Sequence, residues 1–395
     1  MELALHNTLP FTSGIFFGFM CAAIGLVFAV KGLLQKKIPY RFVLLFINLS
    51  YIVLLFPKPI QLIALVGYLY GIVLLLRRFY RSDNLILPML LLSAPMLFMK
   101  WVNVQPASED NKFLETAQLV IQVAGLSYLI FRVIGLYVDE RRSTERIRLV
   151  DFFNFSTFVP TLLIGPIDRY RHFLTQSNNG YKSLTKSSFG DGWLFLIKGL
   201  VYKFILAEFI HRIILLHLND DSSLVYHLEY MYTYVFYLYF DFAGYSLLAR
   251  AFGQFIGVWV PVNFDKPFLA VNPKEFWKKW HKSLGDWLND YFFKPIFKFL
   301  TTKQYFKPIT RQNLALFLTF TLMGFWNGFE LHYVISGMFF GFMSVIHNYY
   351  IYRCKKNSRD VVFGQMKPDL VRIISIFIMF NLVTFSIYIF SGQLV

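Results

Sequence analysis

Long runs without charge dominate this sequence and limit what it can fold into. Only 16% of the 395 residues are charged and 56% are hydrophobic, whereas a soluble domain carries about 25% charged residues. About 20 apolar residues cross the hydrocarbon core of a bilayer as a helix. These values exclude a soluble enzyme, a disordered protein and a disulfide-rich secreted domain. They predict an all-α polytopic membrane protein.

We expect ten spans and one broken element. The broken element covers residues 152–164, an apolar run that is short and ends at Gly165-Pro166, where proline cannot continue a helix. The ten spans cover residues 14–32, 42–56, 60–76, 85–101, 117–138, 193–218, 230–248, 314–326, 333–350 and 373–390.

These spans predict a single integral membrane domain over residues 1–395. Its N-terminal spans fall in residues 1–140, its motif-bearing core in 150–350 and its C-terminal span in 370–392. No tandem repeat is visible along the chain.

The charged loops predict the topology. The chain has 39 lysines and arginines against 23 acids, a net charge of +16. Basic residues gather in the loops 31–41, 77–81, 141–148 and 353–359, whereas the loops 57–59, 103–111 and 219–221 hold few. By the positive-inside rule the basic loops are cytoplasmic, which places the N-terminus outside. The excess charge therefore indicates topology and attraction to anionic membrane lipids, and we expect no nucleic-acid partner.

The two cysteines give no sign of a metal or redox site. Cys21 and Cys354 lie far apart and match no metal-ligating or redox spacing. We therefore expect no metal.

A basic, tryptophan-rich segment interrupts the pattern of spans between residues 251 and 311. Phe276, Trp280, Leu284 and Trp287 recur at helical spacing, which predicts one apolar helical face. Two interpretations stand at this point: an amphipathic helix on the inner leaflet, or the lining of a pocket that docks a polyanionic partner. His281 within it is either a packed side chain or a group that moves a proton near neutral pH.

An acidic residue lies inside an apolar span. Asp241 belongs to the run 240–246, and a carboxylate in hydrocarbon is costly unless it is paired or faces a wet cavity. It is therefore a candidate site residue, with Tyr245 and Ser246 beside it. The alternative is a structural pairing with Arg250 or with a lysine that fixes two helices.

Two further motifs place polar residues at helix breaks. Asp168 and Arg169 follow Gly165-Pro166 and suit the freed backbone groups or each other. Asn327 lies between glycines in the run 324–328, where it suits either a close approach of substrate or a contact between helices.

Taken together, the motifs resemble the membrane-bound O-acyltransferase family, and within it the branch that transfers D-alanyl groups to teichoic acid. The resemblance is carried by GPIDR at 165–169, FDFAGYS at 240–246, PVNFDKPF at 261–268, KEFWKKWHKSL at 274–284 and GFWNG at 324–328. Order and spacing match over residues 120–350. The implied fold is a ring of about 10–11 transmembrane helices, with re-entrant and amphipathic helices, around a central tunnel.

The resemblance also implies a reaction. A D-alanyl group would pass from the phosphopantetheine thioester of an acidic cytoplasmic carrier protein to a hydroxyl of lipoteichoic acid outside the bacterial cell membrane. The protein itself would bind no cofactor, and its partners would include small single-span helper proteins. The carrier would dock on Lys294, Phe297 and Lys298.

Only one of the family's two site histidines is present in this chain. One falls on His281, whereas Asn327 stands where the family has the other. Asparagine cannot accept a proton, although its amide can donate to an oxyanion. Three interpretations follow: an asparagine introduced in place of histidine, a natural member that uses His281 or another base, or a member that binds without turnover. The residues expected to line the tunnel or substrate path are Asp168, Arg169, Asp241, Tyr245, Ser246, Trp280 and Trp326.

Two other functions remain compatible with the sequence. A polysaccharide O-acetyltransferase of the same family would use another acyl donor. A polytopic transporter or flippase would also have many spans, broken helices and intramembrane charge. Against the transporter, the two halves show no inverted repeat and the tryptophan-rich segment stays unexplained.

Overall fold

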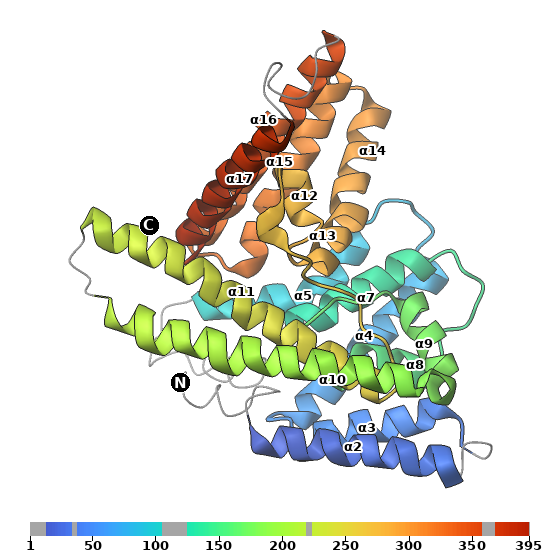
Figure 1. Ribbon diagram of the computed structural model, residues 1–395. Helices are drawn as coiled ribbons and strands as arrows, with labels where there is room; N and C mark the ends of the chain where they lie inside the picture. The colour runs from blue at the N-terminus through green and yellow to red at the C-terminus, as the bar shows by residue number, and fades with distance from the viewer. Residues whose placement is uncertain (1–12, 34–37, 105–124, 219–222, 358–367, 395) are drawn as a thin grey trace, which may run out of the picture. The chain divides into compact units, whose positions relative to one another are not determined.

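The protein is built from helices. The computed structural model describes residues 13–33, 38–104, 125–218, 223–357 and 368–394 (Figure 1). Within these ranges the elements are all helical and no strand occurs, as the sequence predicted. The chain divides into two compact units, residues 1–200 with 244–261 and residues 201–243 with 262–395.

The first unit holds most of the N-terminal helices and includes the predicted broken element. Its helices are α2 (Gly14–Leu33), α3 (Tyr40–Leu55), α4 (Pro59–Phe79), α5 (Ile86–Val104), α7 (Leu126–Glu140), α8 (Leu149–Ser156), η1 (Val159–Thr161), α9 (Tyr170–Ser183) and α10 (Lys186–Leu200). The predicted break is confirmed, because α8 ends at Ser156 and only the short η1 follows.

A buried arginine holds this broken element. The guanidinium of Arg132, on α7, donates to the carbonyls of Phe155 and Ser156 at 3.3 and 3.4 Å, and also to the carbonyl of Thr161. These are backbone groups that an uninterrupted helix would satisfy internally. Arg132 is only 2% exposed, and these carbonyl dipoles help to stabilise its buried charge.

The second unit holds the remaining helices. They are η2 (Val201–Ala207), η3 (Ile210–Ile214), η4 (Leu215–His217), η5 (Pro267–Leu269), α12 (Pro273–Trp277), α13 (Lys282–Leu288), η6 (Asn289–Phe293), α14 (Lys294–Lys303), α15 (Pro308–Asn327), α16 (Leu331–Lys356) and α17 (Pro368–Phe390). The long helix α11 (Leu224–Phe255) contributes residues to both units.

Several predicted spans appear as helices long and apolar enough to cross a membrane. Among the described residues these are α2, α4, α16 and residues 369–390 of α17, and α3 and α5 are shorter apolar helices. Other predictions concern residues outside the described ranges: the basic residues Lys36, Lys37 and Arg359, the acidic loop 219–221, the loop residues 105–111 and the first part of the 117–138 span.

The prediction of one apolar face across the tryptophan-rich segment is wrong. Phe276 and Trp280 are buried, as are Leu284 and Trp287, but they lie on two elements rather than one. The helix α12 stops at Trp277, and α13 begins only after a turn that ends at His281. All four side chains pack within the protein and do not form an exposed apolar face.

Close backbone packing joins α15 to α16. A Cβ added to Gly337 would lie 2.5 Å from the carbonyl oxygen of Phe320, and one added to Gly324 would lie 2.5 Å from that of Tyr333. Only glycine permits so close an approach of two helices. The two helices therefore form a tightly fixed hairpin.

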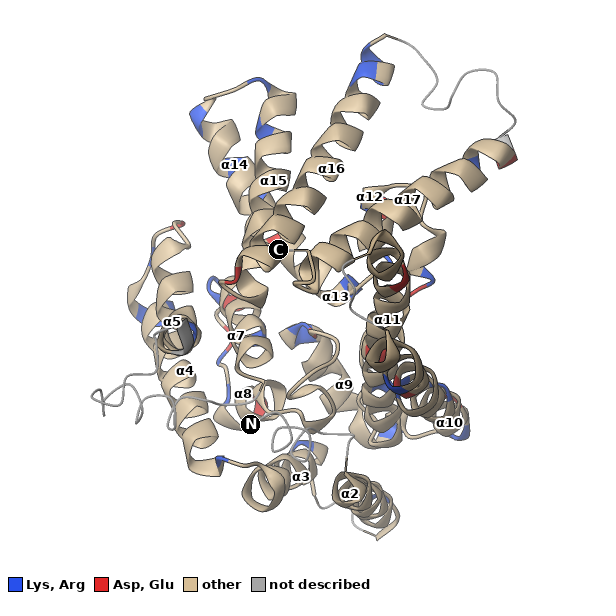
Figure 2. Cartoon of the chain, turned by 90° about the vertical axis from the view of Figure 1, so that its left-hand side faces the viewer, with Lys and Arg blue, Asp and Glu red and all other residues tan. Residues whose placement is uncertain are grey.

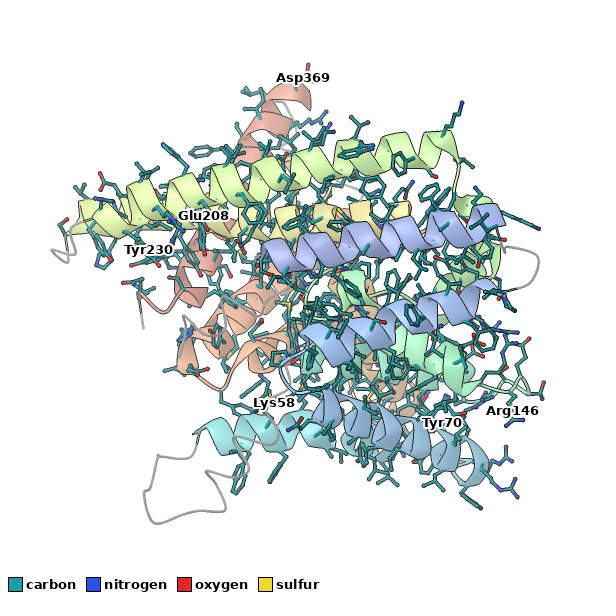
Figure 3. The ribbon with its side chains drawn as sticks, turned by 90° about the horizontal axis from the view of Figure 1, so that it is seen from below. Lys58, Tyr70, Arg146, Glu208, Tyr230 and Asp369 are labelled. Carbon is teal, nitrogen blue, oxygen red and sulfur yellow. The ribbon has the colours of Figure 1, made fainter. Side chains whose placement is uncertain are left out.

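In the first unit, a side chain on α4 fixes the basic loop that precedes α8. The hydroxyl of Tyr70 donates to the carbonyl of Ile147 at 3.0 Å, and Tyr70 and Arg146 lie on the same side of the unit (Figure 3). Arg77, about two helical turns beyond Tyr70, donates to the carbonyls of Ser143 and Glu145 in the same loop.

Candidate active site

His281 occupies an unusual backbone position in the second unit. Its φ of 43° and ψ of 49° lie in the left-handed region, which is costly for a residue with a side chain. Its carbonyl accepts the N–H groups of Leu284 and Gly285, both at 3.0 Å, and so starts α13. Strain of this kind persists only where the surroundings impose it.

The loop that contains the NFDKPF sequence imposes this turn. The N–H of Lys282 donates to the carbonyl of Asn263 at 2.9 Å, and the N–H of Asp265 donates to the carbonyl of Lys279 at 2.9 Å. Two backbone hydrogen bonds thus bracket His281 on both sides. The sequence motifs 261–268 and 274–284, which are separate along the chain, form one structural element.

The imidazole of His281 lies among aromatic rings. The ring of Phe242 meets it edge-on at 4.8 Å, and Phe264 lies at 6.4 Å. His281 is 4% exposed, and neither ring nitrogen has a hydrogen-bond partner among the described residues. Burial lowers the pKa of His281 to about 3. The imidazole is therefore neutral at physiological pH, with one N–H and one lone pair available for a reacting group.

An aromatic cluster connects this turn to the α15–α16 hairpin. Trp280 stacks on Phe276 at 5.6 Å, and Phe276 in turn stacks on Phe340 of α16 at 5.6 Å. Trp277 lies 5.3 Å from Phe320 of α15. The segment that carries His281 is therefore packed directly against the helix that ends in Asn327.

Asn327 is the last residue of α15. Its amide nitrogen donates to the carbonyl of Met323 at 2.9 Å, one turn back on the same helix, and the side chain is exposed. No hydrogen bond joins it to His281 within the described part of the chain. Among the described residues this amide hydrogen-bonds within its own helix, and a contact of Asn327 between helices stays a prediction.

Asp241 forms an ion pair with Lys203. Lys203 lies on η2, a π-helical turn, and Asp241 on α11, so the pair ties these two elements together. This confirms the expected structural pairing with a lysine. The alternative pairing with Arg250 is wrong: the Arg250 guanidinium lies over the ring of Phe195 at 4.0 Å.

The remaining motif residues belong to the first unit. Asp168 accepts the N–H of Arg169 and contacts the imidazole of His172, both at 2.7 Å. The hydrogen bond to Asp168 raises the pKa of His172. Tyr245 and Ser246, on the part of α11 in this unit, are both buried. Their expected roles along a substrate path stay predictions.

The predicted carrier-docking residues lie on α14. Lys294 and Lys298 are exposed, and Lys294 pairs with Asp290 at 2.7 Å. The ring of Phe297 stacks on Phe293 at 5.9 Å. Basic residues gather at the ends of α14 and α16 (Figure 2). From Lys294 to Asn357 the sequence has eight lysines and arginines and a single acid, Glu330, at the opposite end of the hairpin.

Comparison with known proteins identifies the family. Residues 11–391 match the model of the membrane-bound O-acyltransferase family. The chain belongs to this family. The teichoic acid D-alanyltransferase of Streptococcus thermophilus is 31% identical over 406 residues, which cover 96% of this chain and 94% of the relative. That of Bacillus subtilis is 34% identical over 283 residues, 69% of this chain and 70% of the relative. The peptidoglycan O-acetyltransferase of Helicobacter pylori is 30% identical over 213 residues, 52% of this chain and 39% of the relative.

The protein is therefore a multi-pass membrane-bound O-acyltransferase. Within the candidate site, sequence reasoning missed the residues that hold His281 in place, chiefly Asn263 and Phe242. It also missed Lys203, although a lysine inside the apolar run 193–218 is the same kind of signal that drew attention to Asp241.

Proposed function

We propose that the enzyme transfers a D-alanyl group from a carrier-bound phosphopantetheine thioester to a hydroxyl of lipoteichoic acid, across the bacterial cell membrane. The names of the Streptococcus and Bacillus relatives support the acyl group and the acceptor. The observation that carries the proposal is the imidazole of His281, buried and neutral with no partner for either nitrogen among the described side chains and backbone.

In this proposal His281 handles the proton of the reaction. The acceptor oxygen forms a bond to the thioester carbon while its proton passes to the lone pair of the imidazole. The carbon–sulfur bond then breaks, and His281 returns the proton to the departing pantetheine sulfur. Asn327 accepts no proton, so its role is that of an amide donor to the developing oxyanion.

The donor would arrive at the basic end of the helices α14, α15 and α16. Lys303, Lys307 and Arg311 lie where α14 meets α15, and Arg353 and Lys355 lie at the end of α16. Basic termini of this kind face the cytoplasm, and they raise the rate at which an acidic protein docks. An acidic cytoplasmic carrier protein suits this surface.

The acceptor would arrive from the other side. The helix α15 has twenty residues, which corresponds to a length of about 30 Å, close to the hydrocarbon thickness. With its basic start in the cytoplasm, α15 places Asn327 near the external face. The same rule assigns the N-terminus of the chain to the outside. An external polymer therefore has a short path to position 327.

The proposal is tested by reconstituting the enzyme in vesicles with lipoteichoic acid and carrier protein. We expect D-alanyl esters from D-alanyl-carrier and none from acetyl-coenzyme A, with products read by mass spectrometry. His281→Gln, which cannot act as a base, should lower the rate by about 10²–10⁴-fold. His217→Gln, at an exposed histidine of η4, is the matched control and should leave the rate unchanged.

Two results would contradict this function. Transfer of acetyl rather than D-alanyl groups would identify the enzyme as a polysaccharide O-acetyltransferase instead. A normal rate in His281→Gln, with the variant folded, would remove His281 from the reaction.

A further inference from the structure

The first unit contains a groove whose lining residues belong to none of the sequence motifs. It runs between α2, α10 and α11, and we call it the α2–α10 groove. Phe17, Cys21 and Ile24 line it from α2, Trp193 from α10 and Phe255 from α11. Its volume is about 380 Å³. Cys21 and Trp193 are exposed, so the groove opens at the surface of the unit.

The lining of the α2–α10 groove excludes water as a stable occupant. All nine lining residues are aromatic or aliphatic side chains or the thiol of Cys21. A buried water needs two to four polar partners, which these walls do not offer. The helix α2 is also long and apolar enough to span a membrane, so the opening faces hydrocarbon.

The groove is too small to enclose a transmembrane helix of another protein. A helix with its side chains is about 10 Å across, so ten of its residues occupy roughly 1,200 Å³. The empty space of the groove, including its part open to the surroundings, amounts to about 810 Å³. A single flexible hydrocarbon chain fits such a space, whereas a helix does not.

One end of the groove carries positive charge. Phe28 of α2 lies 5.7 Å from Phe189 of α10, which fixes the two helices side by side at this end. Lys31 follows Phe28 on the same face of α2, and its ammonium donates to the carbonyl of Leu184. Lys186 precedes Phe189 by one turn on the groove face of α10. Neither ammonium meets a carboxylate in the described residues.

We propose that the α2–α10 groove binds one acyl chain of an anionic phospholipid, and that Lys31 and Lys186 hold its phosphate. The apolar walls take the hydrocarbon chain, and the two ammonium groups meet the headgroup where the groove reaches the membrane surface. Because basic helix ends are cytoplasmic, this lipid belongs to the inner leaflet. Electrostatic attraction of a lysine near the surface to an anionic lipid corresponds to about a fivefold gain in affinity.

The site is tested on the full-length protein in detergent, titrated with dioleoyl phosphatidylglycerol or dioleoyl phosphatidylcholine. Native mass spectrometry counts the lipids bound. We expect one retained phosphatidylglycerol. Cys21→Trp fills the groove and should abolish this binding. Ala22→Trp, on the adjacent exposed position of the same helix, is the matched control and should retain it.

The headgroup contact has its own variants. Lys31→Gln and Lys186→Gln should each lower the affinity for phosphatidylglycerol about fivefold and leave that for phosphatidylcholine unchanged. Lys198→Gln, on the opposite face of α10, should change neither affinity.

If Cys21→Trp does not fold, Ile24→Trp fills the same groove. Equal lipid retention in the groove-filling variant and in Ala22→Trp would overturn the site, and equal affinity of the lysine variants and the wild type would overturn the anionic headgroup.

Discussion

The side-chain oxygen of Asn263 accepts two hydrogen bonds from Ser283, one from its N–H at 3.2 Å and one from its hydroxyl at 2.8 Å. Asn263 is 1% exposed, and Ser283 is the second residue after His281. This contact caps α13 from a distant segment of the chain. It thereby holds the left-handed turn that orients the imidazole.

Removing this cap should displace the side chain of His281. Asn263→Ala leaves two donors of Ser283 without this acceptor, at a cost of about 1–3 kcal/mol. We expect kcat to fall while the KM for the carrier stays unchanged, because the docking surface is untouched. Steady-state kinetics with varied carrier concentration measures both.

Asn272 offers a control of the same residue type. Its side chain caps α12 by accepting the N–H of Glu275 at 2.9 Å. Asn272→Ala should cost about 1 kcal/mol in stability and little in kcat. An equal loss of kcat in both variants would show that Asn263 has no special role in positioning His281.

Acid should destabilise the protein through His281. Its pKa is about 3 when folded and near 6.5 when unfolded, so below pH 6.5 the unfolded chain binds a proton that the folded chain does not. The free energy of unfolding therefore decreases as the pH falls from about 6.5 toward 3. At pH 5 it is about 2 kcal/mol lower than above pH 6.5. Thermal unfolding of His281→Gln should lack this part of the pH dependence, whereas His217→Gln should keep it. Identical pH profiles of wild type and His281→Gln would argue against the depressed pKa.

The pair of Lys203 and Asp241 should be strongly coupled. Each single variant, Lys203→Met or Asp241→Leu, removes this ion pair at a site where the two side chains are only 9% and 21% exposed, and should cost up to about 3–5 kcal/mol. The double variant removes both charges and should cost much less. A double-mutant cycle on unfolding free energies measures the coupling.

The same helical segment provides a control pair. Arg212 and Glu208 form an exposed ion pair at 2.5 Å, and Glu208 is labelled in Figure 3. Arg212→Met should cost less than about 1 kcal/mol because water screens exposed charges. Equal costs for the two pairs would mean that Lys203 and Asp241 are solvated.

Replacing Asn327 by histidine should raise the rate. In this chain His281 is the proposed acceptor of the hydroxyl proton, and Asn327→His adds a second group able to take it. We expect a rise in kcat of about tenfold or more. Asn327→Ala, which removes the amide donor, should lower kcat. An unchanged rate in Asn327→His would show that position 327 does not contact the acceptor.

The spans were predictable because the bilayer imposes a simple rule on sequence. Long apolar runs such as 14–32 and 333–350 form helices, since a backbone in hydrocarbon has to satisfy its own hydrogen bonds. A break in the run 152–164 was also predictable, from the Gly165-Pro166 pair, although the helix ends earlier, at Ser156. The structure extends most of these helices by a few residues, whereas the predicted span 193–218 is divided among α10, η2, η3 and η4.

The turn at His281 was not predictable from local sequence. The spacing of Phe276, Trp280 and Leu284 suits a continuous helix, and no glycine or proline marks a break between them. The break is imposed by Asn263, which lies some twenty residues away in the chain. Likewise the sequence did not identify which basic residue pairs with Asp241, because the π-helical turn at Lys203 changes which side chains face α11.

The glycine contacts between α15 and α16 have a consequence for the surrounding lipid. Because the backbone of Gly337 touches that of α15, the two helices cannot slide along each other. With 26 residues, or about 39 Å, α16 exceeds an average hydrocarbon core, and the rigid pair adapts to membranes of different thickness only by tilting as one body. Acyl-chain length in the host membrane therefore sets the inclination of the hairpin, and with it the depth at which position 327 lies.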